Sequence, residues 1–242
     1  MAKLKNVAAI ALIAAISLQV ASSNIAGATD TIPPDTTAAT TTVVPTTTTV
    51  APKNLTPRDI VKISKIQTKN PVVFITIDDG VTVSPQLAKV LDKSGVAITT
   101  FALPEMVWRA RKWYRARENM TFENHTNSHV DMTSISPQKQ KIELCHANKL
   151  IKEIVGERPT MYRPPRGSWS DENRTAMAKC GLKYAVLWNI VIDNTVPENL
   201  EFRKGDIILL HYVPSLPKVL PQILKMLKKQ KLEPALLRDY LK

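Results

Sequence analysis

Residues 71–81 read PVVFITIDDGV, and this stretch decides how the rest of the chain is interpreted. The run from Val72 to Ile77 is almost entirely apolar, as expected of a strand buried on both faces of a sheet. It ends in two adjacent carboxylates, Asp78 and Asp79, and then Gly80. Asp and Gly are ordinary turn residues. Because like charges repel, a bound cation, or a carboxylate that acts as a base, is the alternative to a simple turn.

Strand-like and helix-like segments alternate along the chain, which predicts an α/β fold with helices covering a parallel sheet. The expected strands are residues 72–77, 96–103, 160–163, 184–192 and 206–211, and the expected helices are residues 84–95, 136–156, 170–181 and 216–231. Barrels of this class place the active site at the carboxyl ends of the strands. Asp78 and Asp79 come at the end of one expected strand, Arg163 ends another and His211 a third.

The N-terminal residues are typical of a secretory signal peptide. A positively charged start precedes an apolar run from Val7 to Val20, and residues 26–28 read Ala-Gly-Ala, a small-x-small cleavage pattern. We expect residues 1–28 to be removed on secretion. An uncleaved anchor is the less favoured alternative, because a membrane span needs about 20 apolar residues.

Residues 29–54 are dominated by Thr, Pro, Ala and Val. Such a segment lacks the large apolar groups that would offset the entropy of ordering. It is expected to be a disordered linker, and its composition is also typical of O-glycosylated stalks. The folded part, residues 55–242, is then long enough for one well-buried domain.

Positive charge is concentrated in the folded part, and the whole chain has a formal net charge of +12. Basic residues gather at 109–117 and 225–231. Solvated helix faces explain such clusters, and attraction to an anionic surface such as a cell wall is the alternative. Nucleic acid is not an expected partner of an exported chain without a recognisable motif for it. We expect a monomer with no membrane span after signal cleavage.

The two cysteines, Cys145 and Cys180, exclude a disulfide-scaffolded miniprotein, and their spacing is not that of a zinc finger. Both lie on expected helices that follow one another in the chain. In an oxidising location they could form one bridge. Two buried thiols acting as small apolar side chains are the alternative.

The stretch NHTNSH places His125 and His129 four residues apart. On a helical turn these positions share a face, so both imidazoles could bind one ion. Together with Asp79 they would make a site that leaves a position open for water, which is the pattern of catalytic zinc. The metal would polarise a carbonyl and acidify water.

The remaining polar residues could supply acid–base chemistry. Asp78 would be free to act as a base, with Arg163 as its orienting or charge-balancing partner. His211 could give a proton to a leaving group. His146 lies in the middle of an expected helix and is interpreted as a surface or packing residue.

Four of these motifs, in this order, resemble the NodB-type polysaccharide deacetylases, carbohydrate esterase family 4. The matching stretches are TIDDG (76–80), HTNSH (125–129), RPPRG (163–167) and LLH (209–211). The resemblance runs from about Val72 to the C-terminus. It implies a single-domain distorted (β/α) barrel that hydrolyses N-acetyl or O-acetyl groups of chitin, xylan or peptidoglycan sugars.

The resemblance also implies a role for each site residue. The ligands of a divalent metal would be Asp79, His125 and His129, with zinc as the default and cobalt or another transition metal also suited to this N/O set. The general base, its orienting partner and the general acid would be Asp78, Arg163 and His211. The groups near the acetyl group and the oxyanion would be Leu209, Trp188 and the backbone N–H near Arg166.

The sequence departs from the family pattern at several positions. Ile77 replaces an aromatic residue, Val81 a Pro, Arg166 a Tyr, and Glu123 stands where Gly often precedes the His motif. The fourth motif of the family is an Asp-Trp element that tunes the catalytic His. Here Asp193 and Trp188 are present without the usual spacing.

The leading interpretation is a secreted, metal-dependent deacetylase of cell-wall or related polysaccharide. One alternative is a carbohydrate-binding or wall-associated protein on the same fold that has lost activity through its fourth motif. Another is an esterase or amidohydrolase of a smaller, non-sugar substrate. The presence of a general base at Asp78 argues against a pure binding module.

Overall fold

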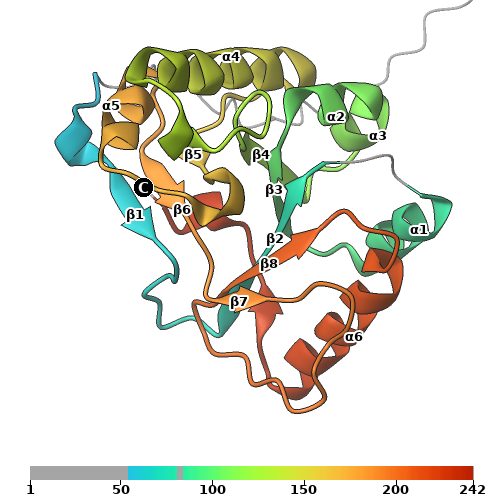
Figure 1. Cartoon of the computed structure of the whole chain (residues 1–242). Helices are drawn as coiled ribbons and strands as arrows, with labels where there is room; N and C mark the ends of the chain where they lie inside the picture. Colours follow the sequence, from blue (N-terminus) through green and yellow to red (C-terminus); the bar gives the residue numbers. More distant parts are fainter. Residues whose placement is uncertain (1–53, 81–83, 242) are drawn as a thin grey trace, which may run out of the picture. The chain divides into compact units, whose positions relative to one another are not determined.

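The computed structural model describes residues 54–80 and 84–241 (Figure 1). The expected signal peptide, residues 1–28, and all but the last residue of the expected linker, residues 29–54, lie outside the described residues. Residues Thr49–Lys242 group together as one unit, and everything below concerns the described part of it.

A single sheet of parallel strands forms the centre of this unit, in the order β1-β6-β5-β4-β3-β2-β8-β7. The strands are β1 (Val61–Ile63), β2 (Val72–Asp79), β3 (Ile98–Ala102), β4 (Met120–Asn124), β5 (Met161–Tyr162), β6 (Tyr184–Val186), β7 (Ile190–Val191), β8 (Ile207–His211) and β9 (Glu233–Pro234), which pairs with β2. No pairing joins β1 to β7 among the described residues. The sheet is therefore an incomplete barrel, which confirms the expected distorted (β/α) class.

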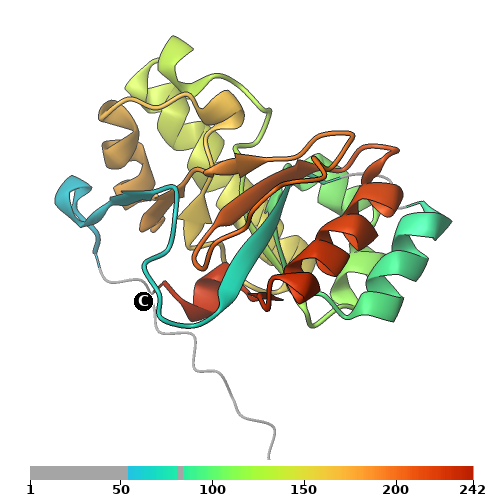
Figure 2. The ribbon, with the colours of Figure 1, turned by 90° about the horizontal axis from the view of Figure 1, so that it is seen from below.

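Helices pack against this sheet, as Figures 1 and 2 show. They are α1 (Pro85–Ser94), α2 (Pro104–Arg109), α3 (Arg111–Arg115), α4 (Pro137–Val155), α5 (Glu172–Lys179) and α6 (Leu216–Lys229). In both views α1 and α6 lie side by side, and they are in contact. Helix α4 contacts both β4 and α5.

Local capping signals set the ends of two helices where the sequence predicts them. Ser84 Oγ accepts a hydrogen bond of 3.1 Å from Leu87 N at the start of α1. Gly95 and Gly156 follow α1 and α4 with φ of 58° and 90°, in the left-handed region that Gly adopts without steric cost. Both expected helices are confirmed.

The expectation of one strand over residues 184–192 is wrong. The chain forms β6, which pairs with β1 and β5, and then β7, which pairs with β8 on the other side of the sheet order. Asn189 lies between them, and its side chain hydrogen-bonds Ile207 N and Asp206 at 2.8 Å each. The apolar run is continuous, but its two halves have different neighbours.

The carboxyl ends of the central strands meet at one edge of the sheet. Strand β2 runs between β3 and β8, so that Asp78 lies opposite His211 and Asp79 lies opposite Ala102. His125 follows the last residue of β4, and its N–H donates to Ala102 O at 3.2 Å. The topology therefore brings the two carboxylates next to the motifs that contain His125 and His211.

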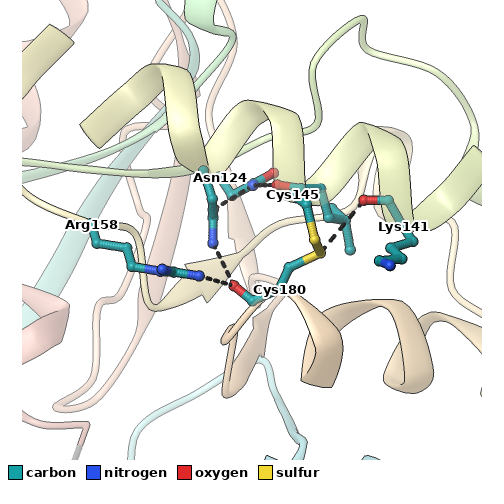
Figure 3. The surroundings of a disulfide bond; sticks show 7 residues. Asn124, Lys141, Cys145, Arg158 and Cys180 are labelled. Atoms are coloured by element: carbon teal, nitrogen blue, oxygen red, sulfur yellow. Dashed lines mark hydrogen bonds between the residues drawn. A yellow bond between two sulfur atoms is a disulfide. The ribbon is translucent and has the colours of Figure 1, made fainter. Parts of the chain in front are cut away.

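Cys145 and Cys180 form a disulfide that joins α4 to the end of α5 (Figure 3). This decides between the two alternatives that the sequence left open. In the part of the chain that the structure describes, no helix is long and apolar enough to cross a membrane.

Candidate active site

Three side chains converge at the carboxyl end of β2. Asp79 Oδ1 lies 3.6 Å from His125 Nε2 and 3.5 Å from His129 Nε2, and one ligand atom from each residue lies within 4.8 Å of the other two. Two atoms that each lie about 2.0–2.2 Å from a tetrahedral ion are roughly 3.3–3.6 Å apart. The spacing suits a single transition-metal ion.

Asp79 Oδ1 is buried and has no hydrogen-bond partner among the described residues. Leaving a buried carboxylate oxygen without a partner is costly. The Nε2 atoms of His125 and His129 lie beside it, and they can bind a metal ion together with it. A nitrogen–oxygen ligand set with an unpaired carboxylate oxygen fits a zinc-like cation.

Backbone contacts prepare His125 for this role. Its Nδ1 lies 2.9 Å from Arg163 O, so that Nδ1–H donates to the carbonyl and the Nε2 lone pair is left for a cation bound beside Asp79. This is the usual way in which an outer partner selects the tautomer of a metal-binding His. Burial lowers the pKa of His125 from its ordinary value, against the opposing pull of Asp78 and Asp79, which favours the neutral ring that a metal requires.

The expectation that His125 and His129 share a helical turn is wrong. Both lie in a loop after β4, and their rings meet edge to face with centroids 5.1 Å apart. Thr126 and His129 have φ of 70° and 58°. Two left-handed residues fold the loop back on itself and bring the imidazoles together without a helix.

Left-handed backbone is concentrated at this site. Five described residues other than Gly have positive φ: Asp79, Thr126, His129, Arg166 and Lys231. Four of the five belong to the three motifs around the carboxylates. Such conformations are costly for a β-branched residue like Thr126 and tend to gather where function demands them.

Asp78 faces a cationic side chain, that of Arg163. Its Oδ1 accepts from Arg163 Nη1 at 2.7 Å, and the two side chains are 4% and 0% exposed. Arg163 Nε and Nη2 donate to Val186 O and Leu187 O at 3.0 and 3.2 Å. These hydrogen bonds hold the guanidinium in one orientation. The guanidinium in turn fixes the orientation of the Asp78 carboxylate.

Thr76 is a site residue that the sequence reasoning missed. Its hydroxyl accepts from Arg163 Nη1 at 2.8 Å and donates to Ile208 O at 2.7 Å. It lies two residues before Asp78 on β2 and therefore points to the same side of the strand. The sequence did offer a signal for Thr76, because it is a polar residue inside an apolar strand and lies two positions before Asp78.

His211 lies opposite Asp78 on the neighbouring strand, at the end of β8. Its Nδ1 is 3.8 Å from Asp193 Oδ1, and the two side chains are 36% and 67% exposed. Asp193 therefore reaches the His despite the unusual spacing of the fourth motif. The distance is too long for a hydrogen bond, so the contact orients the ring only weakly.

The three residues expected near the substrate lie close to Arg163 or to His211, in the chain or in space. Arg166 is exposed and left-handed, with φ of 59°. Trp188 packs on the same loop, where a Cβ added to Gly167 would lie 3.2 Å from its ring, and Arg163 lies over its ring at 5.6 Å. Leu209 is buried in β8, two residues before His211.

Glu123, an unusual residue before the His motif, has a structural role. It is fully buried, and its Oε2 accepts from Thr160 N and Met161 N at 2.8 Å each. Arg238 donates to its Oε1 at 3.1 Å. Burial raises the pKa of Glu123, and Arg238 opposes the shift. The carboxylate joins β4 to the start of β5 and to the C-terminal segment.

The sequence profile described as "Polysaccharide deacetylase" matches residues 65–185. The chain is 29% identical to a chitooligosaccharide deacetylase of Sinorhizobium fredii, over 60% of this chain and 73% of that protein. It is 24% identical to a peptidoglycan-N-acetylglucosamine deacetylase of Bacillus cereus, over 62% of each. The chain spans between 51% and 66% of the length of the first curated relatives that it matches.

Solved structures agree with the fold. A pseudoenzyme of carbohydrate esterase family 4 from Bacillus anthracis superposes with a TM-score of 0.64 at 20% identity, over 78% of this chain and 70% of that one. At this identity the likeness shows the fold alone.

Proposed function

The chain belongs to the polysaccharide deacetylase family, and on this premise we propose that it is a metal-dependent hydrolase that removes acetyl groups from a polysaccharide or oligosaccharide outside the cell. The relatives named above act on chitooligosaccharide and on peptidoglycan N-acetylglucosamine. An N-acetylated, glucosamine-containing glycan is accordingly the proposed substrate class.

The observation that carries this proposal is that the two adjacent carboxylates have different partners. Asp79 has an unpaired buried oxygen facing two imidazole nitrogens. Asp78 has its own cation, Arg163, at 2.7 Å. Asp78 Oδ2 also lies 3.7 Å from His125 Nε2, so this oriented carboxylate is beside the proposed metal ligands. A binding module has no need for a second carboxylate that is held in place there.

The ligands of the proposed metal are Asp79, His125 and His129. When bound there, a zinc-like ion would supply the Lewis acidity that polarises the acetyl carbonyl. The geometric fit supports the ligand set and leaves zinc as the default choice.

The protein's own groups would move the protons. Asp78, oriented by Arg163, takes a proton from the attacking water. His211, across from it on β8, gives a proton to the leaving sugar nitrogen. The backbone N–H near Arg166 stabilises the oxyanion, while Leu209 and Trp188 line the acetyl end of the site.

Acetate release from N-acetylglucosamine oligomers, measured with zinc and with a chelator, tests the proposal. We expect chelator-sensitive activity that Asp78→Asn lowers by about 10²- to 10⁴-fold while zinc binding is retained. Asp171→Asn is the matched control, because Asp171 is 86% exposed, and it should leave the activity unchanged. Full activity of the Asp78→Asn variant would rule out the assigned base.

The second candidate function is a glycan-binding protein without activity. The weak contact between His211 and Asp193 favours it, as does the existence of a pseudoenzyme with the same fold. Wild-type protein that binds glycan oligomers but releases no acetate with zinc or cobalt would establish this alternative.

Secretion and association with an anionic cell wall remain part of the proposal, supported by the net charge of +12. Some of the basic residues at 109–117 already have partners: Arg115 donates to Glu153 O at 2.9 Å, and Arg117 lies 2.5 Å from Asp92. The Lys-rich end of α6 is then the stronger candidate surface. Binding to isolated walls that does not weaken as salt rises would contradict the electrostatic part.

A further inference from the structure

A carboxylate on helix α4, that of Glu143, binds the loop that carries His125 and His129. Glu143 Oε2 accepts from Asn127 N and from Ser128 N at 2.9 Å each. Its Oε1 accepts from the Ser128 hydroxyl at 2.9 Å. Among the residues that the structure describes, Glu143 forms no ion pair, so both carboxylate oxygens serve this loop.

The two amides that Glu143 binds are consecutive in the chain and lie between His125 and His129. They follow Thr126, whose φ is 70°. Successive amides after a left-handed residue form a concave donor group that suits an anion. The carboxylate of Glu143 occupies this position and stabilises the left-handed turn that brings the imidazoles together.

A second connection reaches the same loop from the interior. Asn124 Nδ2 donates to Leu144 O at 2.9 Å and to Asn148 Oδ1 at 2.6 Å. Asn124 Oδ1 accepts from Thr126 N at 2.8 Å, and Thr126 Oγ1 accepts from His129 N at 2.9 Å. The chain of hydrogen bonds runs from α4 to the backbone of a metal ligand.

The disulfide lies on the same stretch of α4 (Figure 3). Cys145 stands between Glu143 and Asn148 in sequence, and its partner Cys180 accepts, through its carbonyl oxygen, from Asn148 Nδ2 and Arg158 Nη2 at 2.9 Å each. The bond therefore joins α4 to the end of α5 along the stretch where Glu143 contacts the loop and Asn148 contacts Asn124 at the end of β4.

We propose that Glu143 is a positioning residue for the metal centre. It holds the turn between His125 and His129 so that both Nε2 atoms face Asp79, with Asn148 and the disulfide fixing α4 behind it. This inference rests on the metal-binding part of the proposed function.

Metal affinity of the Glu143→Gln variant tests this role. Zinc and cobalt dissociation constants are measured by competition with a chelator, together with the visible spectrum of the cobalt-loaded protein. Loss of an outer partner of a metal ligand weakens binding by about 10- to 100-fold. We expect a loss in this range for Glu143→Gln and an altered cobalt spectrum.

Glu153→Gln is the matched control, because it makes the same change on the same helix at a side chain that is 58% exposed. Its dissociation constants should equal those of the wild type. Thermal unfolding of each variant without metal shows whether a loss of metal affinity comes from a loss of stability. Ser128→Ala changes an exposed loop residue and removes one of the three groups that donate to Glu143.

Equal affinities of Glu143→Gln and the wild type, or equal losses in Glu143→Gln and Glu153→Gln, would overturn the proposal. If Glu143→Gln does not fold, zinc and cobalt dissociation constants of Ser128→Ala equal to those of the wild type would overturn the proposal instead. Acetate release by the same preparations reports separately on the proposed activity. A wild-type protein that binds neither cation would overturn the premise and this inference together.

Discussion

Arg163 Nη1 lies 2.7 Å from Asp78 Oδ1, and both side chains are almost completely removed from water. The pair joins β2 to the end of β5, which are separated by β3 and β4 in the sheet order. Burial lowers the pKa of Arg163, and Asp78 opposes that shift. Each charge is therefore tolerated in the interior because the other is present.

Replacing Arg163 should destabilise the whole domain. Arg163→Met leaves the Asp78 carboxylate buried without its cation, which costs about 3–5 kcal/mol of unfolding free energy, measured by urea denaturation. Arg109→Met is the control, since Arg109 and its partner Glu105 are 62% and 71% exposed, and it should change stability by about 0.5 kcal/mol or less. Similar effects of the two variants would contradict the buried-pair argument.

Metal should stabilise the folded protein through Asp79. A ligand that binds only the folded state at 100 times its dissociation constant adds about 2.7 kcal/mol to the unfolding free energy, so zinc should raise the unfolding midpoint and a chelator should reverse the change. Asp79→Asn weakens the oxygen ligand and should abolish most of the shift. An equal shift in this variant would place the metal elsewhere.

Asp193 should matter little to catalysis. The pair with His211 spans 3.8 Å and is largely exposed, and such pairs change an equilibrium by about fivefold at most. We expect Asp193→Asn to lower kcat/KM by no more than this, against a far larger loss for His211→Ala. A hundredfold loss of kcat/KM in Asp193→Asn would show that Asp193 does tune His211 in catalysis.

Loss of the disulfide should reduce stability more than it changes the site. The bond closes a loop with a sequence separation of 35 residues, and a bridge of this kind is worth about 2–4 kcal/mol. The Cys145→Ser/Cys180→Ser variant should unfold at correspondingly lower guanidinium concentration. Free thiols in the oxidised wild type, detected by alkylation and mass measurement, would show that the bond does not form.

Features that depend on neighbouring residues in sequence could be predicted. The start of α1 follows from Ser84 and Pro85, and its end from Gly95, because capping acts within one turn. The apolar run before Asp78 predicted a parallel strand, because a strand buried on both faces consists of continuous apolar residues. Features that depend on partners could not: residues 184–192 split into β6 and β7 because the two halves pair with different strands.

The motif residues were identified from the sequence, but their arrangement was not. His125 and His129 meet through a left-handed loop rather than a helical turn, since Glu143 and Asn124 hold that loop from α4 and β4. Asp193 reaches His211 in spite of its spacing because β7 and β8 are neighbours. Sequence spacing carries no information on contacts of this kind.

By itself, the sequence determined the α/β class, the ends of the main helices and the types of chemical group at the carboxyl ends of the strands, because these follow from local periodicity, capping and composition. Only the tertiary structure decided how Asp78 and Asp79 are placed against Arg163 and His125 and that the two cysteines pair. It also showed that α4 supports the histidine loop. Those outcomes depend on distances between segments far apart in the chain, which the packing of the sheet and its helices sets.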